Sequence, residues 1–186
     1  GCSNLNNIYV PNVAQLFFLS SGSGQSNPFA LARHLFVNDE ELTELVIPNG
    51  VEELNEGFFY NYGKNVASET IPNSVTKIGG SAFKQGWNLT KVEIPDSVVT
   101  IENNAFNGCS DLERIDMGKG VKTIGEYAFF NCYNLSYVHY ASTEENFYKI
   151  SISTNENDEF FNAQFAFDNS AFSVSPTSVY NFTARE

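Results

Sequence analysis

Cysteine and cationic residues are both scarce in this 186-residue chain. Its three cysteines include no Cys-x-x-Cys pair, so the sequence indicates neither a disulfide framework nor a zinc site. Ten Lys and Arg stand against 22 Asp and Glu, which gives a formal net charge of −12. A surface this acidic repels phosphate backbones, so we expect no nucleic-acid partner.

Long apolar runs are also absent. The longest, Leu16–Leu19, falls far short of the roughly 20 residues that a membrane-spanning helix needs, so we expect no membrane insertion. No signal peptide is visible, and the sequence opens on Gly1-Cys2. Cys2 has two interpretations, a lipidated first residue or a core cysteine of an earlier repeat, and the repeats below favour the second. The chain would then be a fragment of a longer protein.

The abundant residues recur at a fixed spacing. A valine is followed three positions later by an aliphatic residue, and then by a small residue and phenylalanine. The four copies are Val51-Leu54-Phe58-Phe59, in which Phe58 stands in place of the small residue, Val75-Ile78-Ala82-Phe83, Val98-Ile101-Ala105-Phe106 and Val121-Ile124-Ala128-Phe129. Their valines lie 24, 23 and 23 positions apart. A period of about 23 residues is typical of a solenoid, in which one unit per turn stacks on its neighbours.

A second pattern, L-x-x-L-x-I-P, precedes these segments and predicts a short strand in each turn. Its copies begin at Leu5, Leu42, Leu89, Leu112 and Leu135, with a weaker copy at Val66 that carries Glu69 at an aliphatic position and belongs to a repeat with one extra residue. Strands of successive turns should pair into a parallel sheet, and proline should end each strand because it lacks an N–H. The phenylalanines of the Ala-Phe pairs should then stack inside as an aromatic ladder.

This pattern resembles the BspA-type, or treponemal, family of bacterial-surface leucine-rich repeats. Ile94-Pro95, Val98, Ile101, Ala105-Phe106 and Cys109 match the family repeat, as do Val121, Ile124-Gly125, Ala128-Phe129 and Cys132. The resemblance implies a leucine-rich repeat solenoid: a right-handed coil with short parallel strands on its concave face and an irregular or short-helical convex side. It also implies an extracellular or cell-surface location, and a host or cell-surface protein, or a glycan, as partner.

A larger repeat relates the two ends of the chain at an offset of 130 residues, since Cys2, Leu5 and Ile8 match Cys132, Leu135 and Val138. We therefore expect four parts: 1–37, the end of an upstream repeat plus an irregular module; 38–140, leucine-rich repeats; 141–167, a second irregular module; and 168–186, a tail or linker. In the second module Ser142-x-x-Glu145 predicts a capping box that opens a helix through Tyr148.

Few residues suggest chemistry, and we expect no catalysis, cofactor or metal. His34 and His139 lack the helical partner of a metal site, which favours structural or surface roles. Cys109 and Cys132 occupy predicted core positions, which favours inert thiols, although adjacent turns could bring them together. The acidic stretch 155–159 does not follow the spacing of a calcium loop, which favours a solvated turn.

The outward positions of the predicted strands are the candidate binding surface. Lys91, Glu93, Arg114 and Asp116 form a mixed-charge patch, while Tyr137 and His139, with Tyr140 nearby, add aromatic surface. The full candidate set is Tyr9, Glu44, Lys91, Glu93, Arg114, Asp116, Tyr137 and His139. Charges on neighbouring strands can also simply pair with one another, at about 0–1 kcal/mol each. Three functions stay open: an adhesion or recognition module, a rigid spacer, and a glycan-binding accessory module.

Overall fold

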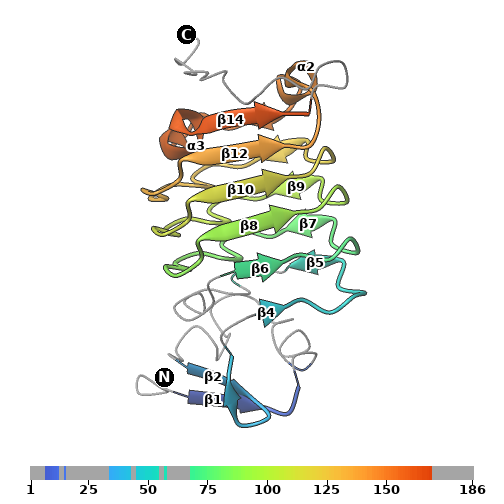
Figure 1. The fold of residues 1–186 in the computed structure, drawn as a ribbon, viewed down its shortest axis with the longest axis vertical. Coiled ribbons are helices and arrows are strands. Elements are labelled where there is room, and N and C mark those ends of the chain that lie inside the picture. Colours follow the sequence, from blue (N-terminus) through green and yellow to red (C-terminus); the bar gives the residue numbers. More distant parts are fainter. Residues whose placement is uncertain are drawn as a thin grey trace.

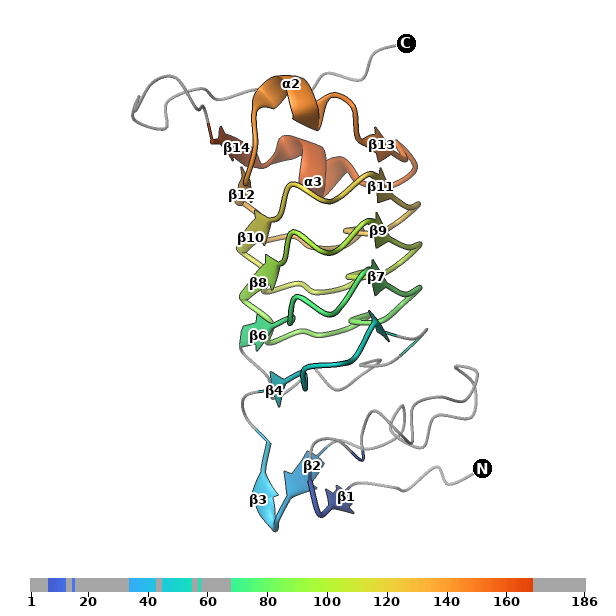
Figure 2. The same ribbon diagram turned by 90° about the vertical axis from the view of Figure 1, so that its right-hand side faces the viewer.

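The computed structural model describes residues 7–12, 15, 34–42, 45–54, 57 and 68–168. Most of them form a stack of coils, and each coil contributes one strand to each of two parallel sheets, called here the front and rear sheets (Figure 1). Figure 2 shows the two sheets edge-on, with the coils joining them at both sides. The solenoid predicted from the period of 23 residues is confirmed.

The front sheet consists of the L-x-x-L-x-I segments from Leu42 onward, together with one further strand from the second irregular module. Its strands, in order, are β4 (Leu45–Val46), β6 (Ser68–Thr70), β8 (Lys91–Ile94), β10 (Arg114–Met117), β12 (Tyr137–Tyr140) and β14 (Gln164–Phe167). Ile115 pairs with both Val92 and Val138, so equivalent residues of successive coils lie side by side. Inward and outward side chains alternate along β8 and β10, which places Val92, Ile94, Ile115 and Met117 in the core.

The rear sheet lies on the returning limb, which we expected to be irregular or briefly helical. Its strands are β5 (Glu53–Leu54), β7 (Lys77–Ile78), β9 (Thr100–Ile101), β11 (Thr123–Ile124) and β13 (Ser151–Ile152). They pair in parallel because the aliphatic residue three positions after each repeat valine points inward at the equivalent position of every coil. Ile78, Ile101 and Ile124 are accordingly buried. The sequence did not indicate this strand pairing.

The predicted aromatic ladder is present at the centre of the coils. Phe83, Phe106 and Phe129 stack with ring centroids 5.0 and 5.4 Å apart and planes within 6°. Phe160 continues the stack at 4.8 Å from Phe129. An alanine precedes each of Phe83, Phe106 and Phe129 and is fully buried, which leaves room for the ring.

Cys109 and Cys132 form a second, smaller ladder in the core. Both are fully buried, and their Sγ atoms donate hydrogen bonds of 3.2 Å to the carbonyls of Phe83 and Phe106 in the preceding coil. Burial raises the pKa of the Cys132 thiol well above its usual value, and the neighbouring Cys109 adds to this. A thiol so placed packs as a small apolar group and is a poor nucleophile. Cys2 lies outside the described residues.

Residues 141–167 form one longer coil. It holds α2 (Glu144–Phe147) and α3 (Asp158–Asn162), while β13 and β14 keep register with β11 and β12. Tyr137 pairs with Gln164, 27 positions later, so this coil has four residues more than the spacing of 23 that joins Arg114 to Tyr137. The predicted capping box is wrong by one residue: Thr143 caps α2 by accepting from Asn146 N, and Ser142 accepts from the Asn146 side chain.

A buried asparagine, Asn157, holds the long coil to the one before it. Its Oδ1 accepts from Phe129 N at 3.0 Å, and its Nδ2 donates to the Gly125 and Ser153 carbonyls at 2.9 and 2.8 Å. Glu159 accepts from Asn131 N at 3.1 Å. The stretch 155–159 is therefore more than the solvated acidic turn that we expected, because Asn157 is fully buried.

The N-terminal strands repeat the same arrangement. β1 (Asn7–Val10) pairs in parallel with β2 (His34–Val37), and Asn7 pairs with His34, also 27 positions later. β3 (Glu40–Glu41) then folds back antiparallel on β2 through Asn38 and Asp39, whose φ angles of 53° and 65° suit a tight hairpin. The matching registers support the 130-residue internal repeat. The four-part division of the chain stays a prediction.

Candidate functional site

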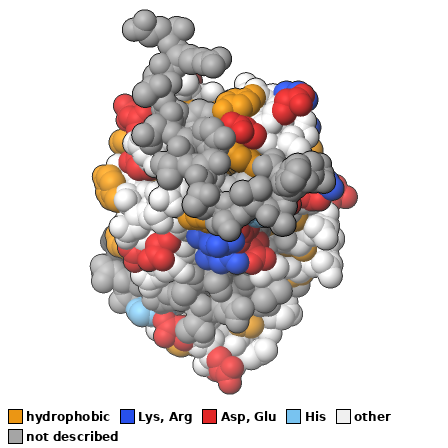
Figure 3. Space-filling model, turned by 45° about the horizontal axis from the view of Figure 1, so that its top comes forward, with side chains coloured by type: hydrophobic (Ala, Val, Ile, Leu, Met, Phe, Trp, Pro, Cys, Tyr) orange, Lys and Arg blue, Asp and Glu red, His pale blue; other side chains and the backbone are white. Residues whose placement is uncertain are grey.

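The mixed-charge patch lies on the outer face of the front sheet. The parallel register aligns Lys91 with Arg114 and Tyr137, and Glu93 with Asp116 and His139. The six candidate residues from three adjacent strands therefore occupy two neighbouring rows. In the space-filling view, basic side chains lie directly against acidic ones (Figure 3).

Asp116 is the centre of the patch. Arg114 donates from Nε to both carboxylate oxygens at 2.9 and 3.0 Å, and its terminal nitrogen lies 2.6 Å from Oδ1. Lys91 bridges two carboxylates, with Nζ 3.1 Å from Asp116 and 2.5 Å from Glu93. We call these four residues the Asp116 network.

The pKa shifts of the network follow from this geometry. Burial opposes ionisation of Asp116, but hydrogen bonds from Arg114 and Lys91 outweigh it and hold the Asp116 pKa below its ordinary value. Hydrogen bonds to Glu93 and Asp116 raise the pKa of Lys91. The two cations of the network thus pair with its two carboxylates. These ion pairs order the side chains of the patch and leave its net charge close to zero.

Replacing Asp116 by asparagine tests the stabilising effect of the network. A carboxylate whose pKa is lowered on folding stabilises the protein above its unfolded-state pKa, and this contribution is lost as the pH falls through the folded-state pKa. Because the Asp116 side chain is 20% exposed, we expect Asp116→Asn to lose about 1 kcal/mol at pH 7. Urea unfolding at pH 7 and at pH values below 3.8 should show this difference shrinking in acid. The exposed Asp111→Asn is the control, and an equal loss there would contradict the assignment.

Tyr137 and His139 extend the patch toward β14. The Arg114 guanidinium carbon lies 4.6 Å from the centroid of the Tyr137 ring, a cation–π contact that orders both side chains. His139 Nε2 lies 2.9 Å from Asp168, directly after β14, and Nδ1 lies 3.7 Å from Asp116. The two rings therefore belong to the same surface as the network.

Three other sequence expectations have different outcomes. Tyr9 is exposed on β1 and stacks on Phe36 at 4.7 Å, in a sheet separate from the network. Glu44 lies outside the described residues. Tyr140 was expected to add aromatic surface, and this is wrong: it points inward, is 1% exposed, and contacts Phe147.

A groove runs beside the network, where the front strands end. It has a volume of about 780 Å³ and crosses successive coils. Its floor repeats the Ile-Pro pairs Ile47-Pro48, Ile71-Pro72 and Ile94-Pro95, followed by Met117-Gly118. Proline was expected to end each strand because it lacks an N–H, but it does so only in the first three coils, at Pro48, Pro72 and Pro95. Their half-buried rings form a ladder along the floor.

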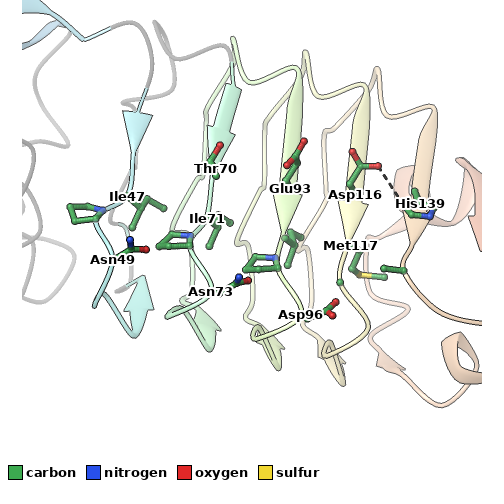
Figure 4. A pocket seen from close by; sticks show the side chains of 16 residues that line it. Ile47, Asn49, Thr70, Ile71, Asn73, Glu93, Asp96, Asp116, Met117 and His139 are labelled. Atoms are coloured by element: carbon green, nitrogen blue, oxygen red, sulfur yellow. Dashed lines mark ion pairs between the residues drawn. The ribbon is translucent and has the colours of Figure 1, made fainter. Parts of the chain in front are cut away.

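Polar side chains line both rims of this groove (Figure 4). Thr70, Glu93, Asp116 and His139 follow one rim, and Asn49, Asn73 and Asp96 follow the other. Three carboxylates thus line the groove, and among the described residues no lysine or arginine does. Lys91 and Arg114 pair with these carboxylates from the sheet face, and Lys119 lies 3.4 Å from Asp96.

Sequence reasoning missed this groove. It assigned proline only to strand ending, although the recurrence of Ile-Pro followed by Asn or Asp was visible in the sequence. A repeat that places the same residues at one corner of every coil must build a continuous strip there.

Among the described residues no helix is both long and apolar enough to cross a membrane.

These features define a class: a two-sheet parallel solenoid whose coils carry a leucine-rich repeat and whose strand face carries a groove. The model of the BspA-type leucine-rich repeat region, in six copies, matches residues 30–159. The chain belongs to this family. No curated protein matches it.

Two solved structures are similar to the chain. One is a leucine-rich cell surface protein from Faecalibacterium prausnitzii, 28% identical, with a TM-score of 0.42 over 62% of this chain and 36% of that one. The other is a leucine-rich repeat protein from Bacteroides ovatus, 16% identical, with a TM-score of 0.40 over 82% of this chain and 52% of that one. This chain thus spans about a third and about half of their lengths.

Proposed function

We propose that this chain is a non-enzymatic recognition module that acts at the cell surface and binds an extended, cationic segment of a partner protein. The family to which it belongs is typical of adhesion and binding proteins. The observation that carries the proposal is the groove of about 780 Å³ along the Ile-Pro ladder. A solenoid offers such elongated surfaces because each coil repeats the same contact.

The lining of the groove supports this choice of partner. The proline rings offer apolar contact. Glu93, Asp96 and Asp116 line the groove while Lys91, Arg114 and Lys119 lie outside it, so a cationic segment would share these carboxylates with their present partners. The chain's net charge of −12 would also steer a cationic partner toward it. The Asp116 network orders one rim before binding, which reduces the entropy lost on association.

Two other functions remain as outcomes of the test. A glycan would use the polar rims through hydrogen bonds, and a rigid spacer would use no surface at all. Charge reversal at Lys91 or Arg114 would not separate these functions cleanly, because it would also remove one of the two cations paired with Asp116. Substitutions within the groove avoid this problem.

The test is a binding screen of the chain against immobilised extracellular-matrix proteins, basic peptides and a glycan array. The double variant Thr70→Arg, Asn73→Arg places bulk and positive charge on both rims of the groove. The matched control is Thr123→Arg, Asn134→Arg, which changes the same residue types at exposed positions outside it. Circular dichroism checks that both variants fold.

We expect a basic protein or peptide to bind the parent and the control, and to bind the groove variant at least about tenfold more weakly. Equal binding by all three proteins would remove the site from the groove. Binding of glycans alone would favour the accessory-module function. Binding of no probe would favour the spacer.

A further inference from the structure

A small pocket beneath α2 gathers positive charge in this acidic protein. It has a volume of about 190 Å³ and is lined by Lys119, Lys122, Tyr140, Ser142, Asn146, Lys149 and Ile150. Three of the ten Lys and Arg residues of the chain thus meet at one site. Among the described residues no aspartate or glutamate lines it, which contrasts with the acidic groove.

The three lysines are only weakly engaged elsewhere. Lys119 and Lys149 make exposed ion pairs with Asp96 and Glu145 at 3.4 and 3.0 Å, and such pairs contribute little. Lys122 has no ion-pair partner in the part of the chain that the structure describes. The lysines come from two different coils, because Lys119 and Lys122 follow β10 and Lys149 follows α2. An anion at the pocket would relieve their mutual repulsion.

Hydroxyl and amide groups complete the lining. Ser142 and Asn146 contact each other at 3.0 Å, and the hydroxyl of Tyr140 donates to the Lys119 carbonyl at 3.3 Å. Burial, and then the charge of Asp96, raise the pKa of Tyr140, so its hydroxyl stays protonated at neutral pH. The Tyr140 proton is thus already engaged, and the donors left for an anion are the three ammonium groups, the Ser142 hydroxyl and the second N–H of the Asn146 amide. A tetrahedral oxyanion, with three or more acceptor oxygens, can use more of them than a carboxylate with two.

We propose that this pocket binds a sulfate or phosphate monoester group. Its volume lies below the roughly 300–1,000 Å³ of sites for whole small molecules, which suits one charged group of a larger ligand. The net charge of −12 disfavours a dense polyanion, so the group is an isolated ester on an otherwise weakly charged ligand.

The pocket adjoins the groove, yet it is a separate site. Gly118 and Ala141 line the groove, and the residues that follow them, Lys119 and Ser142, line the pocket. A ligand could occupy both sites, but oxyanion binding does not depend on the partner proposed for the groove. The groove variant Thr70→Arg, Asn73→Arg should leave it unchanged, so the two proposals can fail independently.

The test is a titration of the whole chain with sodium sulfate and sodium phosphate at constant ionic strength, followed by amide shifts in proton–nitrogen correlation spectra. We expect saturable shifts at Lys122, Ser142 and Asn146. Lys122→Gln should bind about fivefold more weakly, since it removes one nearby charge. The triple variant Lys119→Gln, Lys122→Gln, Lys149→Gln should show no saturable binding. Lys84→Gln, which removes a charge outside the pocket, should bind like the parent.

The readout must be local, because sulfate and phosphate also stabilise proteins generally by exclusion from their surfaces. Uniform or unsaturable shifts, or equal binding by the triple variant and the parent, would overturn the proposal. N-acetylglucosamine 6-sulfate and glucose 6-phosphate then distinguish the two sources of the ester, and saturable binding of either one supports the site. Glucuronate binding as tightly as both esters would overturn the assignment of a tetrahedral group.

Discussion

Replacing Phe106 by alanine should lower the free energy of unfolding by about 3–5 kcal/mol. The ring is fully buried and stacks on Phe83 on one side and on Phe129 on the other. Its removal leaves a cavity that two neighbouring coils line, and the regular backbone pairing of those coils limits collapse around it. Urea unfolding, with the slope compared to that of the parent, measures the loss.

Two further variants sharpen this test. Phe106→Leu retains much of the buried volume and should cost clearly less. Tyr133→Ala removes an aromatic ring that is 70% exposed and should stay within about 0.5 kcal/mol of the parent. Hydrogen exchange should quicken in the coils on both sides of Phe106, because each contacts the ring. A Phe106→Ala protein as stable as the parent would show that the ladder does not carry the core.

Replacing Asn157 by leucine should cost about 3 kcal/mol or more, although leucine is similar in size and more apolar. Three backbone groups lose their partner in this variant: the Phe129 N–H and the carbonyls of Gly125 and Ser153. Each buried polar group left unpaired costs about 1–3 kcal/mol. Thermal or urea unfolding measures the change.

The control is the same substitution at an exposed asparagine, Asn134→Leu, where we expect a change within about 0.5 kcal/mol. Asn157→Asp is informative as well. The carboxylate can still accept from Phe129 N but cannot donate to the two carbonyls, so a substantial loss should persist. An Asn157→Leu protein as stable as the parent would remove Asn157 from the contacts that hold the long coil.

The core of the fold was predictable because it depends on side-chain identity at a fixed period. Val98, Ile101 and Phe106 recur 23 residues later as Val121, Ile124 and Phe129, and every one of them is buried. Pairing on the rear limb was not predictable in this way. Two-residue strands such as β9 and β11 carry too little alternation to indicate a strand, and they form because neighbouring coils hold them in register.

The site was predictable only in part. Strand alternation correctly brought Lys91, Arg114 and Asp116 to one outer face. Which cation would pair with which carboxylate depends on rotamers that spacing does not determine. The pocket lined by Lys119, Lys122 and Lys149 was missed for a different reason. Lys149 follows α2 and Lys119 follows β10, so these residues are 30 positions apart and share no repeat position that would place them together.

The stacking of coils also determines how the protein would respond to mechanical load. Each strand of the front sheet is hydrogen-bonded only to its neighbours, so tension between the two ends would detach coils one after another from an end. Each ordinary coil spans 23 or 24 residues and would release roughly 80 Å of extended chain. Buried Asn157 adds side-chain hydrogen bonds between the long coil and the coil before it, so we expect the long coil to detach at a higher force than a coil held by backbone pairing alone. A surface protein built this way would lengthen in steps under shear flow and absorb load before its attachment fails.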